Sequence, residues 1–378
     1  MKYIGSNNSL NVEQPESSEI RTSEAIFKPT EHPEASIDVN KRKDYNNNIE
    51  HLFEELDRID LIVRLGLNQF RNKKQGSMNE FQGLYISEEE INAILQIPPS
   101  KSIEIIDSYP EMKKIEFLTK EINIKKKKSI EKGIELRLNS LTELFHLNTF
   151  EVNVLLICLA PELYLKYEKL YAYLQNDVTK KRPSVDFVIN LLKSSNEERL
   201  RARENFSAAA PLIKNYIIYL SGDGHEGQLP LLSNPIKIDE RIISYILGSN
   251  EIDAKIRKFS TIKKTSELSS FDDLILPEEI KNILFELIDR HYQEEYPKPE
   301  MLFFQGPYGT GKKMTAEAVC RELDTPLLVV DSKALIGNES LDILSFILRE
   351  GLLQNSSLYF EHFDALLKDE DSVVSPTN

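Results

Sequence analysis

A glycine-rich run near residue 306 has the residue types and spacing of a phosphate-binding loop. It reads Gly306, Pro307, Tyr308, Gly309, Thr310, Gly311, Lys312, Lys313 and Met314. An apolar run over 301–305 precedes it and a helical pattern follows it, which is the strand–loop–helix context that such a loop requires. Glycines let successive backbone N–H groups converge on a phosphate, and the helix N-terminus favours the same anion. We therefore predict a nucleotide site in which Lys312 reaches the β- and γ-phosphates.

One position departs from the usual pattern of this loop. The pattern ends in a Ser or Thr whose hydroxyl ligates Mg²⁺, and Lys313 stands there instead. Thr315 lies two residues further along the predicted helix. It cannot simply substitute, because residues i and i+2 do not share a helix face.

Acidic residues end two further apolar runs. The first run, 326–330, leads to Asp331, and the second, 357–360, leads to Glu361 and His362. In P-loop ATPases an acid at the end of such a strand orients Mg²⁺, so Glu361 is the candidate metal-facing residue. The next position commonly carries a carboxylate that activates water, and here it is His362. Glu361 and His362 are thus the candidate catalytic residues, although we favour a non-catalytic role for His362 and doubt hydrolysis.

Composition and periodicity divide the chain into five segments. Residues 1–45 are rich in Asn, Ser, Glu and Pro, which predicts a disordered tail. The others are a helical region over 46–137, a winged-helix domain over 138–248, a polar linker over 249–270 and the N-terminal part of a nucleotide-binding module over 271–378. A capping box at Ser87 predicts a helix through Leu95.

The winged-helix prediction depends on the order of its elements. Three helical patterns, over 152–159, 166–174 and 185–192, come before two extended segments, over 212–220 and 234–238, which are joined by the turn SGDGHEG. The third helix of this fold often enters the DNA major groove. The basic candidates for such a contact are Lys180, Lys181, Arg182, Arg199, Arg201 and Arg203. Since acids and bases are nearly balanced in this segment, we favour protein contacts over DNA.

Charge and composition exclude several classes of protein. The 378 residues carry a net charge of −14, which argues against broad nucleic-acid or anionic-membrane binding. No apolar stretch is long enough to span a membrane, and the N-terminus has no signal-peptide pattern, so we predict a cytoplasmic protein. The two cysteines, Cys158 and Cys320, lie in apolar helical patterns and do not indicate a disulfide framework or a zinc site.

Several stretches together resemble one family. They are FDDLILP at 271–277, GPYGTGKKMTAEAV, LLVVD, LYFEHFDAL and, upstream, LLICLAPELYLKYEKLYAYLQNDVTKKRPSVDFV. The chain resembles bacterial AAA+ ATPases that have an N-terminal winged-helix domain and tandem AAA+ modules, of the type associated with contractile injection systems. The resemblance covers roughly residues 49–367.

This resemblance implies an α/β P-loop NTPase fold, AAA+-like and partial, preceded by an α+β winged-helix region. It implies that the chain ends within the first, degenerate AAA+ module, and that residues 271–275 lie near the adenine. ATP and Mg²⁺ are the implied cofactors. The resemblance also implies that the full-length protein forms a homo-oligomeric ring and acts on a protein substrate or assembly partner. Binding to nucleic acid or to a membrane is not expected.

Three functions remain open at this point. The first is an ATPase that remodels or assembles protein complexes, with doubtful hydrolysis by this module. The second is a non-hydrolysing nucleotide-binding scaffold module. The third is a winged-helix DNA-binding regulator.

Overall fold

The computed structural model describes residues 44–74, 109–220, 229–293, 301–336 and 342–366. The predicted helix from Ser87, the turn SGDGHEG and nearly all of the predicted tail lie outside these residues. Of the tail, Tyr45 is described, and the prediction is wrong for it because Tyr45 is buried. Its backbone N–H donates to Ser129 Oγ at 2.8 Å and its hydroxyl donates to Glu54 at 2.8 Å.

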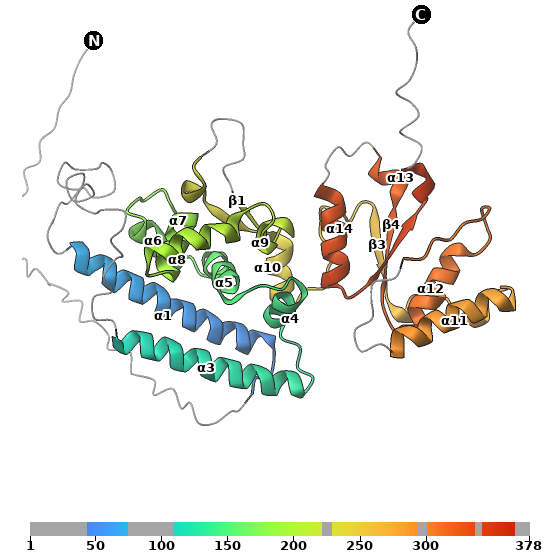
Figure 1. Ribbon diagram of the computed structural model, residues 1–378, viewed down its shortest axis with the longest axis horizontal. Helices are drawn as coiled ribbons and strands as arrows, with labels where there is room; N and C mark the ends of the chain where they lie inside the picture. Colours follow the sequence, from blue (N-terminus) through green and yellow to red (C-terminus); the bar gives the residue numbers. More distant parts are fainter. Residues whose placement is uncertain (1–43, 75–108, 221–228, 294–300, 337–341, 367–378) are drawn as a thin grey trace, which may run out of the picture. The chain divides into compact units, whose positions relative to one another are not determined.

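Two long helices, α1 (Asn48–Lys74) and α3 (Tyr109–Glu131), form the first helical layer (Figure 1). Leu52, Leu56, Ile59 and Val63 recur at helical spacing on α1, and all four are buried. Helix α1 lies within the helical region predicted over 46–137. No helix in the described ranges is long and apolar enough to cross a membrane.

The winged-helix pattern is present between residues 137 and 246. The helices predicted at 152–159, 166–174 and 185–192 are α5, α6 and α7, and the wing strands β1 and β2 pair antiparallel. Part of the segment 212–220 is helical instead of extended, since Pro211 begins a short helix. The elements are α4 (Arg137–Leu144), α5 (Thr149–Leu163), α6 (Lys166–Leu174), α7 (Val185–Leu192), α8 (Asn196–Ala202), α9 (Pro211–Lys214), β1 (Ile218–Leu220), β2 (Ile236–Ile238) and α10 (Glu240–Ile246).

A three-stranded sheet lies in the C-terminal part, with β4 between β3 and β5 (Figure 1). Strands β4 and β5 are parallel and in register, so that Asp331 and Glu361 stand opposite each other at the carboxyl edge. The elements are β3 (Ser260–Lys263), α11 (Glu278–Gln293), α12 (Lys312–Glu322), β4 (Leu327–Asp331), α13 (Ser332–Leu335), α14 (Asp342–Leu353) and β5 (Ser357–Glu361).

Two segments differ from the sequence prediction. Strand β3 lies inside the predicted linker 249–270, where Ile256 and Phe259 are buried and β3 pairs antiparallel with β4. The predicted strand over 301–305 is not a strand, and no described strand pairs with it. Met301 and Phe303 are exposed there, as expected for a segment that has no described strand beside it to exchange backbone hydrogen bonds with.

Buried ion pairs connect α14 to the winged-helix elements. Arg349 Nη2 donates to Asp239 at 3.1 Å and to Asp253 at 2.6 Å, and its side chain is 1% exposed. Arg241 on α10 donates through Nε and Nη2 to both oxygens of Glu350, at 2.9 and 3.0 Å. Burial raises the pKa of Asp239, but Arg349 and Lys255 outweigh it and hold that pKa below its usual value. The carboxylate therefore stays ionised near neutral pH.

We predict that Arg349→Met destabilises the chain by about 3–5 kcal/mol, because it leaves the buried carboxylate of Asp253 without its cation and removes one of the two cations that Asp239 contacts. Chemical denaturation followed by circular dichroism measures this loss. The matched control is Arg257→Met, which removes an arginine from an exposed pair with Glu251. That variant should stay within about 0.5 kcal/mol of the parent. A loss below about 1 kcal/mol for Arg349→Met, the value of an exposed pair, would contradict the role given to the network.

Candidate functional site

The glycine-rich loop has the backbone that its sequence predicts. Gly309 and Gly311 adopt φ values of +84° and +79°, a region that side chains with a Cβ rarely enter. Gly311 is the N-cap residue of α12, so the loop passes directly into the helix N-terminus. A helix N-terminus offers free backbone N–H groups and a positive dipole end. The arrangement therefore suits a phosphate.

Lys312 closes the loop on itself. Its Nζ donates to the carbonyl oxygens of Gly306 and Pro307, at 2.9 and 2.7 Å. Thr310 also donates to the Pro307 carbonyl, at 3.0 Å. Phosphate oxygens are stronger acceptors than neutral carbonyls, so they can replace these two contacts of Lys312. The role of Lys312 as a phosphate-binding lysine stays a prediction.

Lys313 and Glu361 lie in direct contact. Lys313 Nζ donates to Glu361 Oε2 at 3.1 Å, and the two side chains are 35% and 31% exposed. Thr315 is buried, and its hydroxyl donates to the Gly311 carbonyl at 3.0 Å. The hydroxyl ligand expected for Mg²⁺ is thus missing, and the expected carboxylate already holds an ammonium group. These residues do not fit a Mg²⁺ site.

His362 follows Glu361 but faces the neighbouring strand. It has a positive φ of +56°, and its Nδ1 lies 3.5 Å from Asp331 Oδ1 at the end of β4. Asp331 also accepts from the backbone N–H of Lys333, at 3.0 Å. A carboxylate at the position of His362 would be the usual activator of water. This chain has an imidazole paired with an acid there.

Helix α12 is anchored by a buried acid that the sequence analysis did not single out. Glu317 pairs with Lys263 of β3 at 2.6 Å and accepts from the Ser269 hydroxyl at 2.8 Å. Burial raises the pKa of Glu317, but these two contacts outweigh it and lower that pKa. The sequence feature that could have pointed to Glu317 is its position, as an acid among the apolar residues of the helix. Since α12 follows the loop directly, this anchor fixes the end of the loop.

Residues 271–275 contribute to the packing around α11 and α12. Phe271 and Leu274 are buried in an apolar cluster with Leu284, Ile288, Ala318 and Val319. Ile275, at the end of the segment, is fully exposed. The placement of this segment near an adenine stays a prediction.

Acids accompany the basic residues of the winged-helix domain. Lys181 lies 3.6 Å from Glu168, and Arg201 lies 2.5 Å from Glu197. Lys180 lies 3.9 Å from Asp177. DNA binding depends on a net basic surface field, and these pairs weaken it.

The part of the chain that the structure describes contains side chains of the types that bind metals, and two cysteines. No group of three or more His, Cys, Asp or Glu side chains there could hold a metal ion. Cys158 and Cys320 are both buried and unpaired with each other. Burial raises the pKa of both thiols, which keeps them protonated and unreactive.

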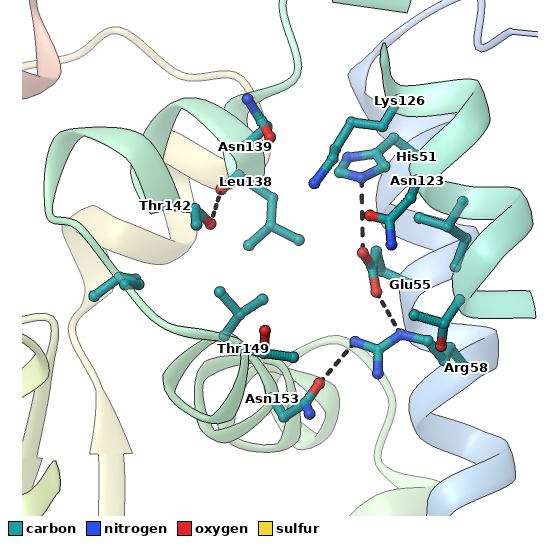
Figure 2. Close-up of a pocket in the computed structure, with 14 residues that line it drawn as sticks. His51, Glu55, Arg58, Asn123, Lys126, Leu138, Asn139, Thr142, Thr149 and Asn153 are labelled. Carbon is teal, nitrogen blue, oxygen red and sulfur yellow. Dashed lines mark hydrogen bonds and ion pairs between the residues drawn. The ribbon is translucent and has the colours of Figure 1, made fainter. Parts of the chain in front are cut away.

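A cavity of about 160 Å³, lined by both polar and apolar side chains, lies among α1, α3, α4 and α5 (Figure 2). Two of its charged groups, Arg58 and Glu55, pair with each other on α1. Arg58 Nε donates to Glu55 at 2.8 Å, and Arg58 Nη2 donates to Asn153 at 2.7 Å. His51 is 1% exposed and lies 3.8 Å from Glu55, and neither ring nitrogen has a hydrogen-bond partner. We assign no ligand to this cavity, because its acid and its guanidinium already pair.

We predict that His51 makes the chain less stable in acid. Burial lowers the pKa of His51, with Glu55 acting in the opposite direction. Below about pH 6.5 an unfolded chain protonates this imidazole while the folded chain resists, so stability is lost as the pH falls. Thermal unfolding at pH 7.5 and 5.5 tests this, and His51→Gln should reduce the difference between the two midpoints. The control, His146→Gln, replaces an exposed histidine; an unchanged difference in His51→Gln would refute the assignment.

Comparison with known families matches two regions of the chain. Residues 34–260, more than half of the chain, match the model described as winged helix domain, variant. Residues 302–377 match the model of the ATPase family associated with various cellular activities, AAA. No curated protein and no solved structure gives a significant match. The chain therefore belongs to the winged helix domain, variant, family, and its C-terminal part is similar to the AAA ATPase family.

Proposed function

We propose that the C-terminal part of this chain binds ATP without hydrolysing it. The observation that carries the proposal is the loop 306–311, which has left-handed glycines, leads into the N-terminus of α12 and is closed by Lys312. An AAA ATPase segment supports a general ATP-binding protein of the AAA+ class. The absence of hydrolysis is supported by His362, which contacts Asp331 at the position where a water-activating carboxylate is usual.

The wider role that we propose is in an ATPase that remodels or assembles protein complexes. In this role the module would act as a nucleotide-dependent scaffold in a homo-oligomeric ring, while hydrolysis takes place elsewhere in the assembly. The winged-helix domain would then contact protein, because three of its basic side chains, Lys180, Lys181 and Arg201, are each accompanied by an acid. The phosphate-binding loop in the same chain favours a nucleotide-dependent scaffold over a DNA-binding regulator.

We predict that Lys312→Ala weakens ATP binding by at least about tenfold, since it removes a charge-assisted contact to the phosphates. Titration calorimetry of the full chain with ATP, in buffers with and without Mg²⁺, measures the affinity. The matched control is Lys237→Ala, which removes an exposed lysine from the wing strand β2. Equal ATP affinity in the parent and in Lys312→Ala would refute the loop assignment.

The same preparation tests hydrolysis. Phosphate release by the parent chain should not exceed the release in ATP alone. Steady release that is lost in Lys312→Ala would show that the module is an active ATPase and would refute this part of the proposal.

A further inference from the structure

We infer that Lys313 takes the place of Mg²⁺, so that the loop binds a nucleoside polyphosphate in its metal-free form. This inference rests on the proposed function, since it concerns the same loop. It begins from the misfit described above: the position of the hydroxyl ligand and the strand-end carboxylate are joined by an ion pair between protein groups.

The place of the ammonium group supports the substitution. In P-loop ATPases the metal lies between the residue after the loop lysine and the acid at the strand end. In this chain Lys313 stands directly after Lys312, and its Nζ is 3.1 Å from Glu361 Oε2. The residue at the first of these two positions therefore places its own positive charge against the acid at the second.

The donor geometry allows nucleotide to be held at the same time. An ammonium group has three N–H donors, and the contact with Glu361 uses one of them. The other two remain for phosphate oxygens. Lys312 supplies a second ammonium once its two carbonyl contacts exchange for phosphate, so the loop presents two cations to the polyphosphate.

The same charges disfavour nucleotide that carries its metal. A Mg²⁺ ion in this place would meet the Lys313 ammonium, and like charges in contact repel. It would also find Glu361 already paired and no hydroxyl at position 313. The ligand class is therefore a nucleoside di- or triphosphate without a divalent cation.

Titration calorimetry of the full chain with ATP tests the inference directly. One buffer contains EDTA, and the other contains Mg²⁺ in excess over ATP. We expect the parent to bind ATP at least as tightly in EDTA as in Mg²⁺. Lys313→Thr restores the hydroxyl and releases Glu361, so it should reverse the order and favour Mg²⁺ by about tenfold.

Two further variants separate charge from shape. Lys313→Met keeps an unbranched side chain but has neither charge nor hydroxyl, so it should bind ATP more weakly than the parent in EDTA and gain nothing from Mg²⁺. Lys237→Thr removes an exposed lysine on the wing strand β2, away from the loop, and should behave as the parent. Circular dichroism confirms that each variant is folded, and Lys313→Met carries the test if Lys313→Thr is not.

The outcomes distinguish this inference from the proposed function. Parent binding that requires Mg²⁺ overturns the inference and leaves ATP binding intact. Unchanged metal-free affinity in Lys313→Met also overturns it. No binding by the parent in either buffer refutes the proposed function itself.

Discussion

Compensation of buried charge is the constraint on which the C-terminal part of the molecule depends. Arg349 and Glu350 are consecutive on α14, and each is almost fully buried against an opposite charge from the winged-helix side. A buried ion that loses its partner is far more costly than an exposed one. These contacts therefore define where α14 lies. Since α14 leads into β5, they also bear on the position of Glu361 at the end of that strand.

A different balance of charge governs the loop. The N-terminus of α12 is positively charged, because the helix dipole adds to the charges of Lys312 and Lys313. The carboxylate of Glu361 contacts Lys313 there. Lys312 is satisfied by loop carbonyls, which are weak acceptors, whereas Lys313 is satisfied by a carboxylate, which is a strong one. The first lysine is thus free to exchange partners, and the second is retained. This difference in acceptor is the basis on which we propose that Lys312 binds phosphate and that Lys313 stands in for a metal.

The sequence predicted the elements with strong local signals. Helical patterns identified the three winged-helix helices, and glycine spacing identified the loop before α12. It could not predict the pairs Arg349–Asp239 and Arg241–Glu350, because the partners are about a hundred residues apart and no local pattern links them. Strand β3 was missed for a similar reason. Its four residues, Ser260–Lys263, are polar or charged apart from Ile262, and pairing with β4 decides their conformation.

Strand β3 has a consequence for how the chain divides into modules. The sequence placed a boundary at residue 271, but a chain begun there would lose the edge strand that pairs with β4. It would also lose Lys263 and Ser269, the partners of Glu317, and Asp253, a partner of Arg349. One of the two strands that pair with β4, and the partners that anchor α12, belong to residues that come before the predicted nucleotide module in the sequence. The module is therefore not separable at the point where its own sequence motifs begin.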